Sequence, residues 1–359
     1  MIALIASTVI GVAIQDAQLP HHTFKETTEG WVLAGTMSPS AKVSLSHDPA
    51  HVKVGTGSLQ FDYDIAQGET NILSLPITDG ALTKMKSLDF WIQSDYTTTV
   101  AVILQEKEGG AYMARFMAPK GQWQMVRLAP SDFVLNSGPT DPKDPDGKLD
   151  LDQVTNISVV DLDFMFAQSD SPMTALFGVV KGAHAMYISD FRASEGMLDV
   201  PSAQTIESYD RPQVQWIGVG KPAMSIMTGP SLPGRALQVT YRTTAGMPVG
   251  ALRSISPGSL SAATQISFKA VSQKPIKLLV QLEETNGNKY NTVVDVPGDS
   301  AGQPISVKFS DLKPSDDSKD KDAKLEAGLI NQLVLADLSG MLTQTEQDNV
   351  LWIGKISSG

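Results

Sequence analysis

The residues that could carry acid–base or metal chemistry are few, and their spacing does not suit it. The chain has no cysteine, which excludes disulfides, thiolate metal sites and cysteine nucleophiles. Of its five histidines, His21 and His22 are adjacent and would point to opposite faces of a strand. Pro49 argues against a helix that would align His47 with His51. No nucleophile elbow, phosphate loop or dinucleotide fingerprint is present. Carboxylates are plentiful, but nothing favours a glycosidase pair, so we expect a protein that is not an enzyme.

An acidic segment, GPTDPKDPDGKLDLD at 138–152, has the composition of a calcium loop. A loop of the helix-loop-helix kind needs acids at positions 1, 3, 5 and 12 and glycine at position 6. With Gly147 at position 6, Asp144 and Asp146 fit, but Pro142 and Gln153 occupy positions 1 and 12. The frame fails at both ends, so we interpret the segment as a solvated connection between strands.

An internal repeat shows which elements must position any site. KSLDFWIQSDYTTTVAVILQEKEGGAYMARFMAP (86–119) aligns without a gap with TQISFKAVSQKPIKLLVQLEETNGNKYNTVVDVP (264–297), at an offset of 178 residues. Tyr63 and Tyr241 coincide at the same offset. We therefore predict a tandem of two similar domains, 19–197 and 205–359, joined near SEGMLDVPSAQ (194–204).

Both copies have the alternation of apolar and polar residues that is typical of β-strands, in short runs bounded by Gly, Pro, Asn and Asp. Sustained helical periodicity is absent from the sequence. The pattern predicts an all-β protein of two tandem antiparallel β-sandwich (jelly-roll) domains. The net charge of −11 repels the phosphates of nucleic acids and of anionic lipids, which argues against both as partners.

The N-terminal 18 residues have the features of a signal peptide. Ile2 to Val12 is an apolar run too short to span a bilayer, and it ends in the small-x-small pattern Gly11, Val12, Ala13. No Lys or Arg precedes Lys25, so the usual positive start is missing. We expect export, to a secreted, periplasmic or cell-surface location; a buried first strand or a disordered end is the alternative.

Strand parity locates candidate binding residues. Leu88, Phe90 and Ile92 are apolar at matching positions of both copies and are assigned to the core. The residues that then point outward in the first copy, together with a loop tyrosine, form the predicted ligand-binding set: Trp91, Gln93, Tyr96, Gln105 and Arg115. If their strands share a sheet, they form one polar and aromatic surface suited to sugars. In the alternative, a loop or the second domain covers Trp91, and Arg115 pairs with an acid.

The order GSLQFDYD, LDFWIQSD, GQWQMVRLAPSDF, LDLDQVTNISV and MYISDFRA resembles the galactose-binding-like jelly rolls. It is most similar to family 11 carbohydrate-binding modules and the complex I intermediate-associated family. The resemblance implies glycan binding on a concave sheet. It also implies a structural calcium held by Asp190 with Glu26 or Glu29, although Asp190 as a surface acid without metal is an equal alternative. The second copy has Lys269 for Trp91 and Lys355 for Asp190, which argues against either site there.

We therefore predict an exported, non-catalytic protein that binds a polysaccharide or other glycan through its first domain. A structural or assembly module that contacts a protein partner is the main alternative, and a glycan-active enzyme is a third hypothesis.

Overall fold

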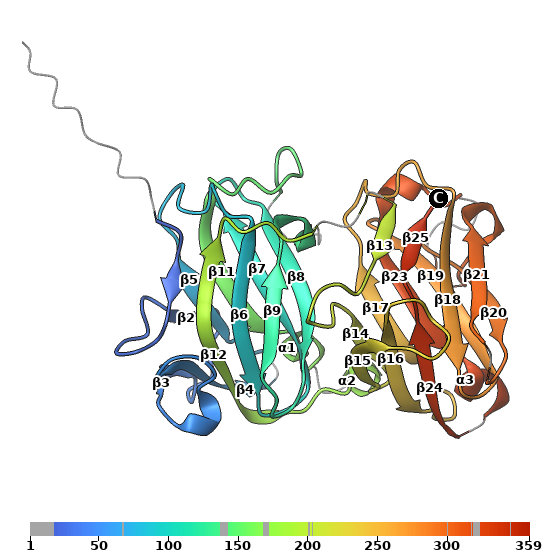
Figure 1. Ribbon diagram of the computed structural model, residues 1–359, viewed down its shortest axis with the longest axis horizontal. Helices are drawn as coiled ribbons and strands as arrows, with labels where there is room; N and C mark the ends of the chain where they lie inside the picture. The colour runs from blue at the N-terminus through green and yellow to red at the C-terminus, as the bar shows by residue number, and fades with distance from the viewer. Residues whose placement is uncertain are drawn as a thin grey trace, which may run out of the picture.

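The structure, a computed structural model, contains two β-sandwiches that lie side by side (Figure 1). It describes residues 18–66, 68–136, 143–167, 172–199, 202, 204–299, 301–316, 318, 324–344 and 346–359. Almost all of the predicted signal peptide and residues 138–142 of the acidic segment lie outside this part. The prediction of an all-β chain with tandem antiparallel sandwiches is confirmed. Among the described residues, no helix has the length and apolar character needed to cross a membrane.

Domain 1 contains sheets A and B. Sheet A has the strand order β3-β4-β12-β6-β9, with β1 paired to β12; sheet B has the order β10-β8-β7-β11-β5-β2. The sheet A strands are β1 (His21–His22), β3 (Lys42–Ser46), β4 (Ser58–Ile65), β6 (Ser87–Ser94), β9 (Gln124–Leu128) and β12 (Gly182–Ser194). The sheet B strands are β2 (Val32–Ala34), β5 (Ile72–Pro76), β7 (Thr98–Glu106), β8 (Ala111–Ala118), β10 (Val134–Leu135) and β11 (Val154–Asp161). The short helices are η1 (Pro49–His51), η2 (Pro130–Asp132), α1 (Asp163–Phe166) and α2 (Pro172–Phe177).

Domain 2 contains sheets C and D. Sheet C has the order β13-β25-β18-β24-β16-β15, with β21 paired to β18; sheet D has the order β14-β17-β23-β19-β20-β22. The sheet C strands are β13 (Thr205–Glu207), β15 (Ala223–Thr228), β16 (Arg235–Arg242), β18 (Gln265–Ser272), β21 (Gln303–Lys308), β24 (Asp348–Ile353) and β25 (Ile356–Ser358). The sheet D strands are β14 (Ile217–Val219), β17 (Val249–Ser254), β19 (Ile276–Glu284), β20 (Lys289–Val296), β22 (Lys313–Pro314) and β23 (Ile330–Asp337). The short helices are η3 (Phe309–Asp311), η4 (Ala327–Leu329) and α3 (Ser339–Thr343).

Each core lies between its two sheets and follows the predicted alternation. Leu88, Phe90 and Ile92 are fully buried, as are their facing residues Val100 and Val102 from β7. The side chains between them in sequence point outward, because successive residues of a strand face opposite sides. Sequence parity therefore assigned these strand faces correctly.

A buried tyrosine–aspartate pair closes the sandwich in both domains. The Tyr63 hydroxyl donates to Asp161 Oδ2 at 2.7 Å, and the Tyr241 hydroxyl donates to Asp337 Oδ2 at 2.9 Å. The second oxygen of each carboxylate accepts a backbone N–H two residues later, from Asp163 and Ser339. Each pair links the two sheets of its domain.

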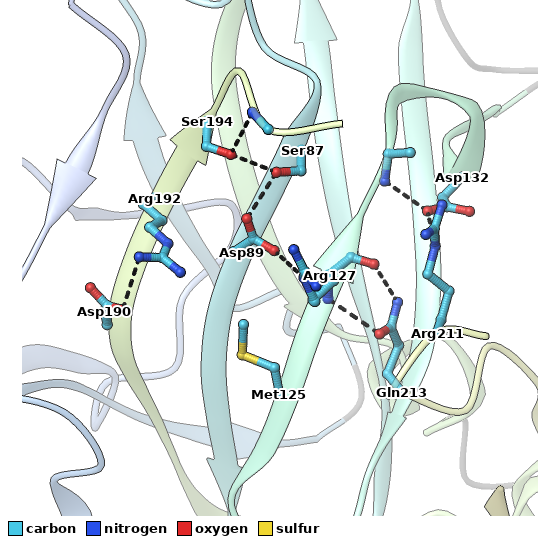
Figure 2. Close-up of polar contacts among 12 residues, drawn as sticks. Ser87, Asp89, Met125, Arg127, Asp132, Asp190, Arg192, Ser194, Arg211 and Gln213 are labelled. Atoms are coloured by element: carbon cyan, nitrogen blue, oxygen red, sulfur yellow. Dashed lines mark hydrogen bonds and ion pairs between the residues drawn. The ribbon is translucent and has the colours of Figure 1, made fainter. Parts of the chain in front are cut away.

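The two domains are joined by the segment that precedes β14. Gln213 is fully buried (Figure 2). Its Oε1 accepts from the Arg127 N–H at 3.2 Å, and its Nε2 donates to the Arg127 carbonyl at 2.8 Å. The side-chain amide thus makes the hydrogen bonds that a neighbouring strand would make at the free edge of β9. The Met117 N–H donates to the Val214 carbonyl at 2.8 Å, and the Met117 side chain packs into the core of domain 2. Arg211 pairs with Asp132 at 3.2 Å. The junction is therefore packed rather than a free linker.

Candidate functional site

The predicted ligand-binding residues lie on two different sheets. Trp91 and Gln93 are on β6 of sheet A, whereas Gln105 and Arg115 are on β7 and β8 of sheet B. The outer faces of the two sheets of a sandwich point in opposite directions, so the predicted single surface is wrong. Sequence parity could assign each strand face but not the sheet to which a strand belongs.

Two members of the set serve local structure. The Gln105 amide donates to the carbonyls of Gly109 and Gly110 at 3.2 and 3.0 Å, which fastens the β7–β8 turn. Tyr96 is buried, its hydroxyl donates to the Asp161 carboxylate, and its ring stacks on His184 at a centroid distance of 3.9 Å. Tyr96 therefore belongs to the interior and does not line the rim of a site, which corrects the prediction.

The carboxylate of Asp161 is the centre of this interior cluster. Besides Tyr63 and Tyr96, it accepts a hydrogen bond of 2.6 Å from the Thr98 hydroxyl. Burial raises the pKa of Asp161, and burial together with the neighbouring Asp161 charge raises the pKa of Asp163 to about 7. Because Asp161 is fully enclosed and saturated with donors, the cluster stabilises the fold rather than offering a reactive group to a ligand.

Trp91 lies at the centre of a different group of side chains on the outer face of sheet A. On this face Trp91 pairs with Ser189 of β12 and Met125 of β9. The next outward row consists of Arg192, Asp89 and Arg127, in the same three strands (Figure 2). Together with Lys53 from the loop before β4, these residues form what we call the Trp91 face: Lys53, Asp89, Trp91, Met125, Arg127 and Arg192.

The two arginines of the Trp91 face are paired with different acids, Arg127 with the buried Asp89 and Arg192 with Asp190, whose Oδ2 lies 4.0 Å from Arg192 Nη1 (Figure 2). Asp89, with 4% of its side chain exposed, accepts a 2.8 Å hydrogen bond from Arg127 Nε and a second, also of 2.8 Å, from the Ser87 hydroxyl. Arg127 and Arg192 are each 46% exposed. Asp89 therefore fixes the Arg127 guanidinium through its Nε, in a side chain that remains 46% exposed. The remaining N–H groups of such a planar guanidinium can donate hydrogen bonds to a ligand.

The loop 47–57 lies over the remainder of this surface. The Lys53 ammonium is 4.7 Å from the centroid of the Trp91 ring, a cation–π contact. His51 stacks on Tyr187 of β12 with centroids 4.0 Å apart, and its Nδ1 lies 3.0 Å from Gln93 Oε1. Gln93 is consequently buried, although parity placed it on the correct face. The alternative in which a loop covers Trp91 is thus partly correct, because Lys53 of this loop lies over the Trp91 ring.

Sequence reasoning missed several residues of this surface. Arg127, Met125 and Arg192 alternate with buried residues of β9 and β12, so the parity used for β6 would have identified them. Trp123, directly before β9 and in step with Met125, is half-buried. The positions of Lys53 and His51 depend on a loop that crosses the sheet and had no signal in the sequence.

Asp190, Glu26 and Glu29 are the residues that the resemblance implies for calcium. Asp190 adopts φ 50° at a bulge in β12, and its Oδ1 lies 3.0 Å from His21 Nε2. The Glu29 carboxylate accepts from the N–H groups of Thr23 and Phe24, the latter at 2.6 Å. Nitrogen donors surround both acids, which does not fit the oxygen cage that calcium prefers. In the described part of the chain, no cluster of three or more candidate ligands is found. Calcium stays a prediction, and we assign it no role.

The described part of the acidic segment is anchored by a buried glutamate. Glu106 Oε1 accepts from the Asp150 N–H at 2.5 Å, and Glu284 of domain 2 accepts from the Glu326 N–H at the same distance. Burial raises the pKa of Glu106 to about 7. Gly147 has φ 70°, and Asp144 and Asp146 accept from nearby backbone N–H groups. These contacts are those of a strand connection.

Domain 2 carries a different surface at the place of the Trp91 face. Lys269 stands for Trp91 and pairs with Pro304, and Ser267 stands for Asp89 and pairs with Ser306. These four residues line a shallow hollow of about 430 Å³, which Lys355 also lines. No arginine is among the described residues that line the hollow, and the one aromatic residue among them, Phe268, belongs to the core of domain 2.

Comparison with known proteins gives likeness in structure but not in sequence. No family model matches the chain, and no curated protein matches it. A family 11 carbohydrate-binding module from Clostridium thermocellum, solved with a β-1,3-1,4-mixed-linked tetrasaccharide, is similar to 51% of this chain over 98% of its own length, with 14% identity and a TM-score of 0.37. A tandem of two family 22 modules from Paenibacillus barcinonensis covers 96% of this chain and 98% of its own, with 13% identity and a TM-score of 0.30.

An exo-β-agarase is also similar, over 54% of this chain and 27% of its own, with 12% identity and a TM-score of 0.35. The chain thus resembles carbohydrate-binding jelly rolls, as expected from its sequence, and the complex I part of that expectation stays a prediction. With TM-scores of 0.30 to 0.37 and identities of 12 to 14%, we base no argument on these likenesses.

Proposed function

We propose that this protein binds carbohydrate through the Trp91 face, without turnover, as an exported protein. The observation that carries the proposal is a half-buried tryptophan on an open sheet face, next to two arginines that are each 46% exposed. A ring at this position is held by its strand neighbours, so little conformational entropy is lost when a ligand stacks on it.

The chemistry of the face matches that of a sugar. A pyranose presents an apolar C–H face, which packs on an aromatic ring, and a rim of hydroxyls, which need donors and acceptors. Trp91 and Met125 supply the apolar floor, since they pair across β6 and β9. Arg127 and Arg192 supply donors on the neighbouring row, one residue pair away.

Lys53 would move when a ligand binds. Its ammonium lies over the Trp91 ring at 4.7 Å, where a sugar would stack. An exposed cation–π contact contributes about 0.5–1 kcal/mol, so a ligand can displace the lysine at low cost. The displaced ammonium then remains beside the ligand as a further donor.

Glycan-array binding of the full chain tests the proposal. The panel should include mixed-linked β-glucan, xylan and β-1,4-galactan oligosaccharides, and the variants are Trp91→Ala and Arg127→Met, with Arg115→Met on the opposite sheet as the matched control. We expect that the wild type and Arg115→Met bind at least one of these glycans and that Trp91→Ala does not bind it. Absence of binding by the wild type to every glycan would overturn the proposal and favour a protein-contacting module.

A further inference from the structure

The predicted residue Arg115 lies at a pocket between the domains. The outer faces of sheets B and D meet where the Arg115 Nη1 of β8 donates to the Ser254 hydroxyl of β17 at 2.6 Å. A pocket of about 150 Å³ opens at this seam, which we call the seam pocket. It lies on the other side of domain 1 from the Trp91 face, so it can be judged independently of the proposed function.

The charge of Arg115 has no acidic counterpart among the described residues, unlike that of the other arginines at the junction. Arg211 pairs with Asp132 at 3.2 Å, and Arg253 pairs with Glu207 at 3.2 Å. Burial alone lowers the pKa of Arg115, with no carboxylate to offset it. A guanidinium that is desolvated without an anion is costly to the fold, and such groups concentrate at functional sites.

The remaining walls of the seam pocket indicate what kind of anion it would hold. Met113 and Leu252 supply apolar lining, and Thr205 and Ser256 add hydroxyls. Asp132 and Arg253 also line the pocket, but each is already paired with an opposite charge, Asp132 with Arg211 and Arg253 with Glu207. The volume is below the roughly 300–1,000 Å³ of pockets that enclose drug-sized ligands, so it suits a single ring rather than a chain. A guanidinium fork binds a carboxylate by two parallel hydrogen bonds.

We propose that the seam pocket binds a sugar acid, with the carboxylate on Arg115 and the ring between the two domains. The ligand is either a free uronate or a uronate unit of a glycan, because both present the same carboxylate on a hydroxylated ring. Both domains contribute to the pocket, so the tandem arrangement is required for binding.

Calorimetric titration of the full chain with galacturonate, glucuronate and their dimers tests this proposal, with galactose, glucose and acetate as controls. We expect uronates to bind and neutral sugars and acetate to bind at least about tenfold more weakly. Arg115→Met should lower uronate affinity about 10- to 100-fold, because a hydrogen-bonded charged group is lost. Binding of the monomers alone identifies a free sugar acid, and tighter binding of the dimers identifies a glycan.

Two variants separate ligand binding from a purely structural role of Arg115. Arg115→Lys retains the charge without the fork and should bind uronate with intermediate affinity. Met197→Ala, at a residue that is 80% exposed and belongs to neither site, should bind uronate as the wild type does. Loss of neutral-glycan binding reports on the Trp91 face, and loss of uronate binding in Arg115→Met reports on the seam pocket, so the two failures give different results. Absence of uronate binding by the wild type would overturn the proposal. Equal binding by a folded Arg115→Met, judged by an unchanged melting transition, would overturn it as well.

Discussion

The Trp91 face and its counterpart in domain 2 have the same strand pairing, but their outward side chains differ in chemistry. In domain 1, β6 presents Asp89 and Trp91 to β9; in domain 2, β18 presents Ser267 and Lys269 to β21. In domain 1 the surface carries the Trp91 ring, which Lys53 contacts. In domain 2 the corresponding surface is a hollow of about 430 Å³. The interior does not differ in this way, since Phe90 and Phe268 are both buried. The fold therefore dictates the inner face of these strands and leaves the outer face free to carry chemistry.

The features that both domains retain are those that hold the sandwich together. The Tyr63–Asp161 and Tyr241–Asp337 pairs bridge the two sheets. Glu106 anchors the connection before β11 through the Asp150 N–H, and Glu284 anchors the connection before β23 through the Glu326 N–H. Within one chain, the repeat thus separates structural residues from candidate functional ones, without an alignment to other proteins.

The largest expected effect concerns the buried carboxylates. Within the described part of the chain, Asp161 accepts three hydroxyl hydrogen bonds, whereas Asp337 accepts one, from Tyr241. Asp161→Ala should therefore destabilise domain 1 by about 3–5 kcal/mol, and Asp337→Ala should destabilise domain 2 by about 2 kcal/mol. Denaturant unfolding followed by tryptophan fluorescence measures both. Equal losses of stability would contradict the expectation that the additional hydrogen bonds of Asp161 stabilise domain 1.

The next effect is a pH dependence that only domain 1 should show at this position, where Asp163 corresponds to Ser339. The folded-state pKa of Asp163 is raised to about 7, from a usual value of 3.8. Between these values the native state binds a proton that the unfolded state lacks, so stability falls as the pH rises through this window.

The variant Asp163→Ser should remove this contribution, of about 2–4 kcal/mol between pH 4 and 7. Thermal unfolding at a series of pH values measures it. A pH profile that the substitution leaves unchanged would show that Asp163 titrates as an ordinary surface acid.

Exchange of side chains between the two outer faces should have a moderate effect. Trp91→Ala removes the stacking surface and should weaken glycan binding by about tenfold or more. The reverse change, Lys269→Trp, should create no binding in domain 2, because Ser267 and Ser306 stand where domain 1 has Asp89 and the arginine that it holds, Arg127. Affinity electrophoresis with the bound polysaccharide compares the two. Binding gained by Lys269→Trp alone would show that the tryptophan suffices.

The smallest expected effect concerns the lysine over the ring. Lys53→Ala exposes Trp91 and should increase the affinity for a neutral glycan by about two- to fivefold, which corresponds to the loss of one exposed cation–π contact. Calorimetry is sensitive enough to detect this change. A decrease instead would mean that Lys53 contributes to the bound state more than it obstructs.

The sequence was sufficient for the fold class and for the faces of the strands that carry Trp91, Gln105 and Arg115, because these depend on local alternation. It identified Trp91 as outward and Phe90 as core, and both hold. It could not place β6 and β8 in different sheets, since β6 pairs with β12, which lies far along the chain. It could not foresee that the loop around Lys53 crosses the sheet, or that Arg115 meets Ser254 of the other domain.

Methionine methyl NMR gives the most direct test of the Trp91 face as the glycan site. Met125 lies beside Trp91, Met113 lines the seam pocket, and Met197 is 80% exposed and belongs to neither site. On titration with a neutral oligosaccharide that binds on the array, we predict a saturable shift of the Met125 methyl signal while Met113 and Met197 stay unchanged. A saturable shift of Met113 with no change at Met125 would contradict the account.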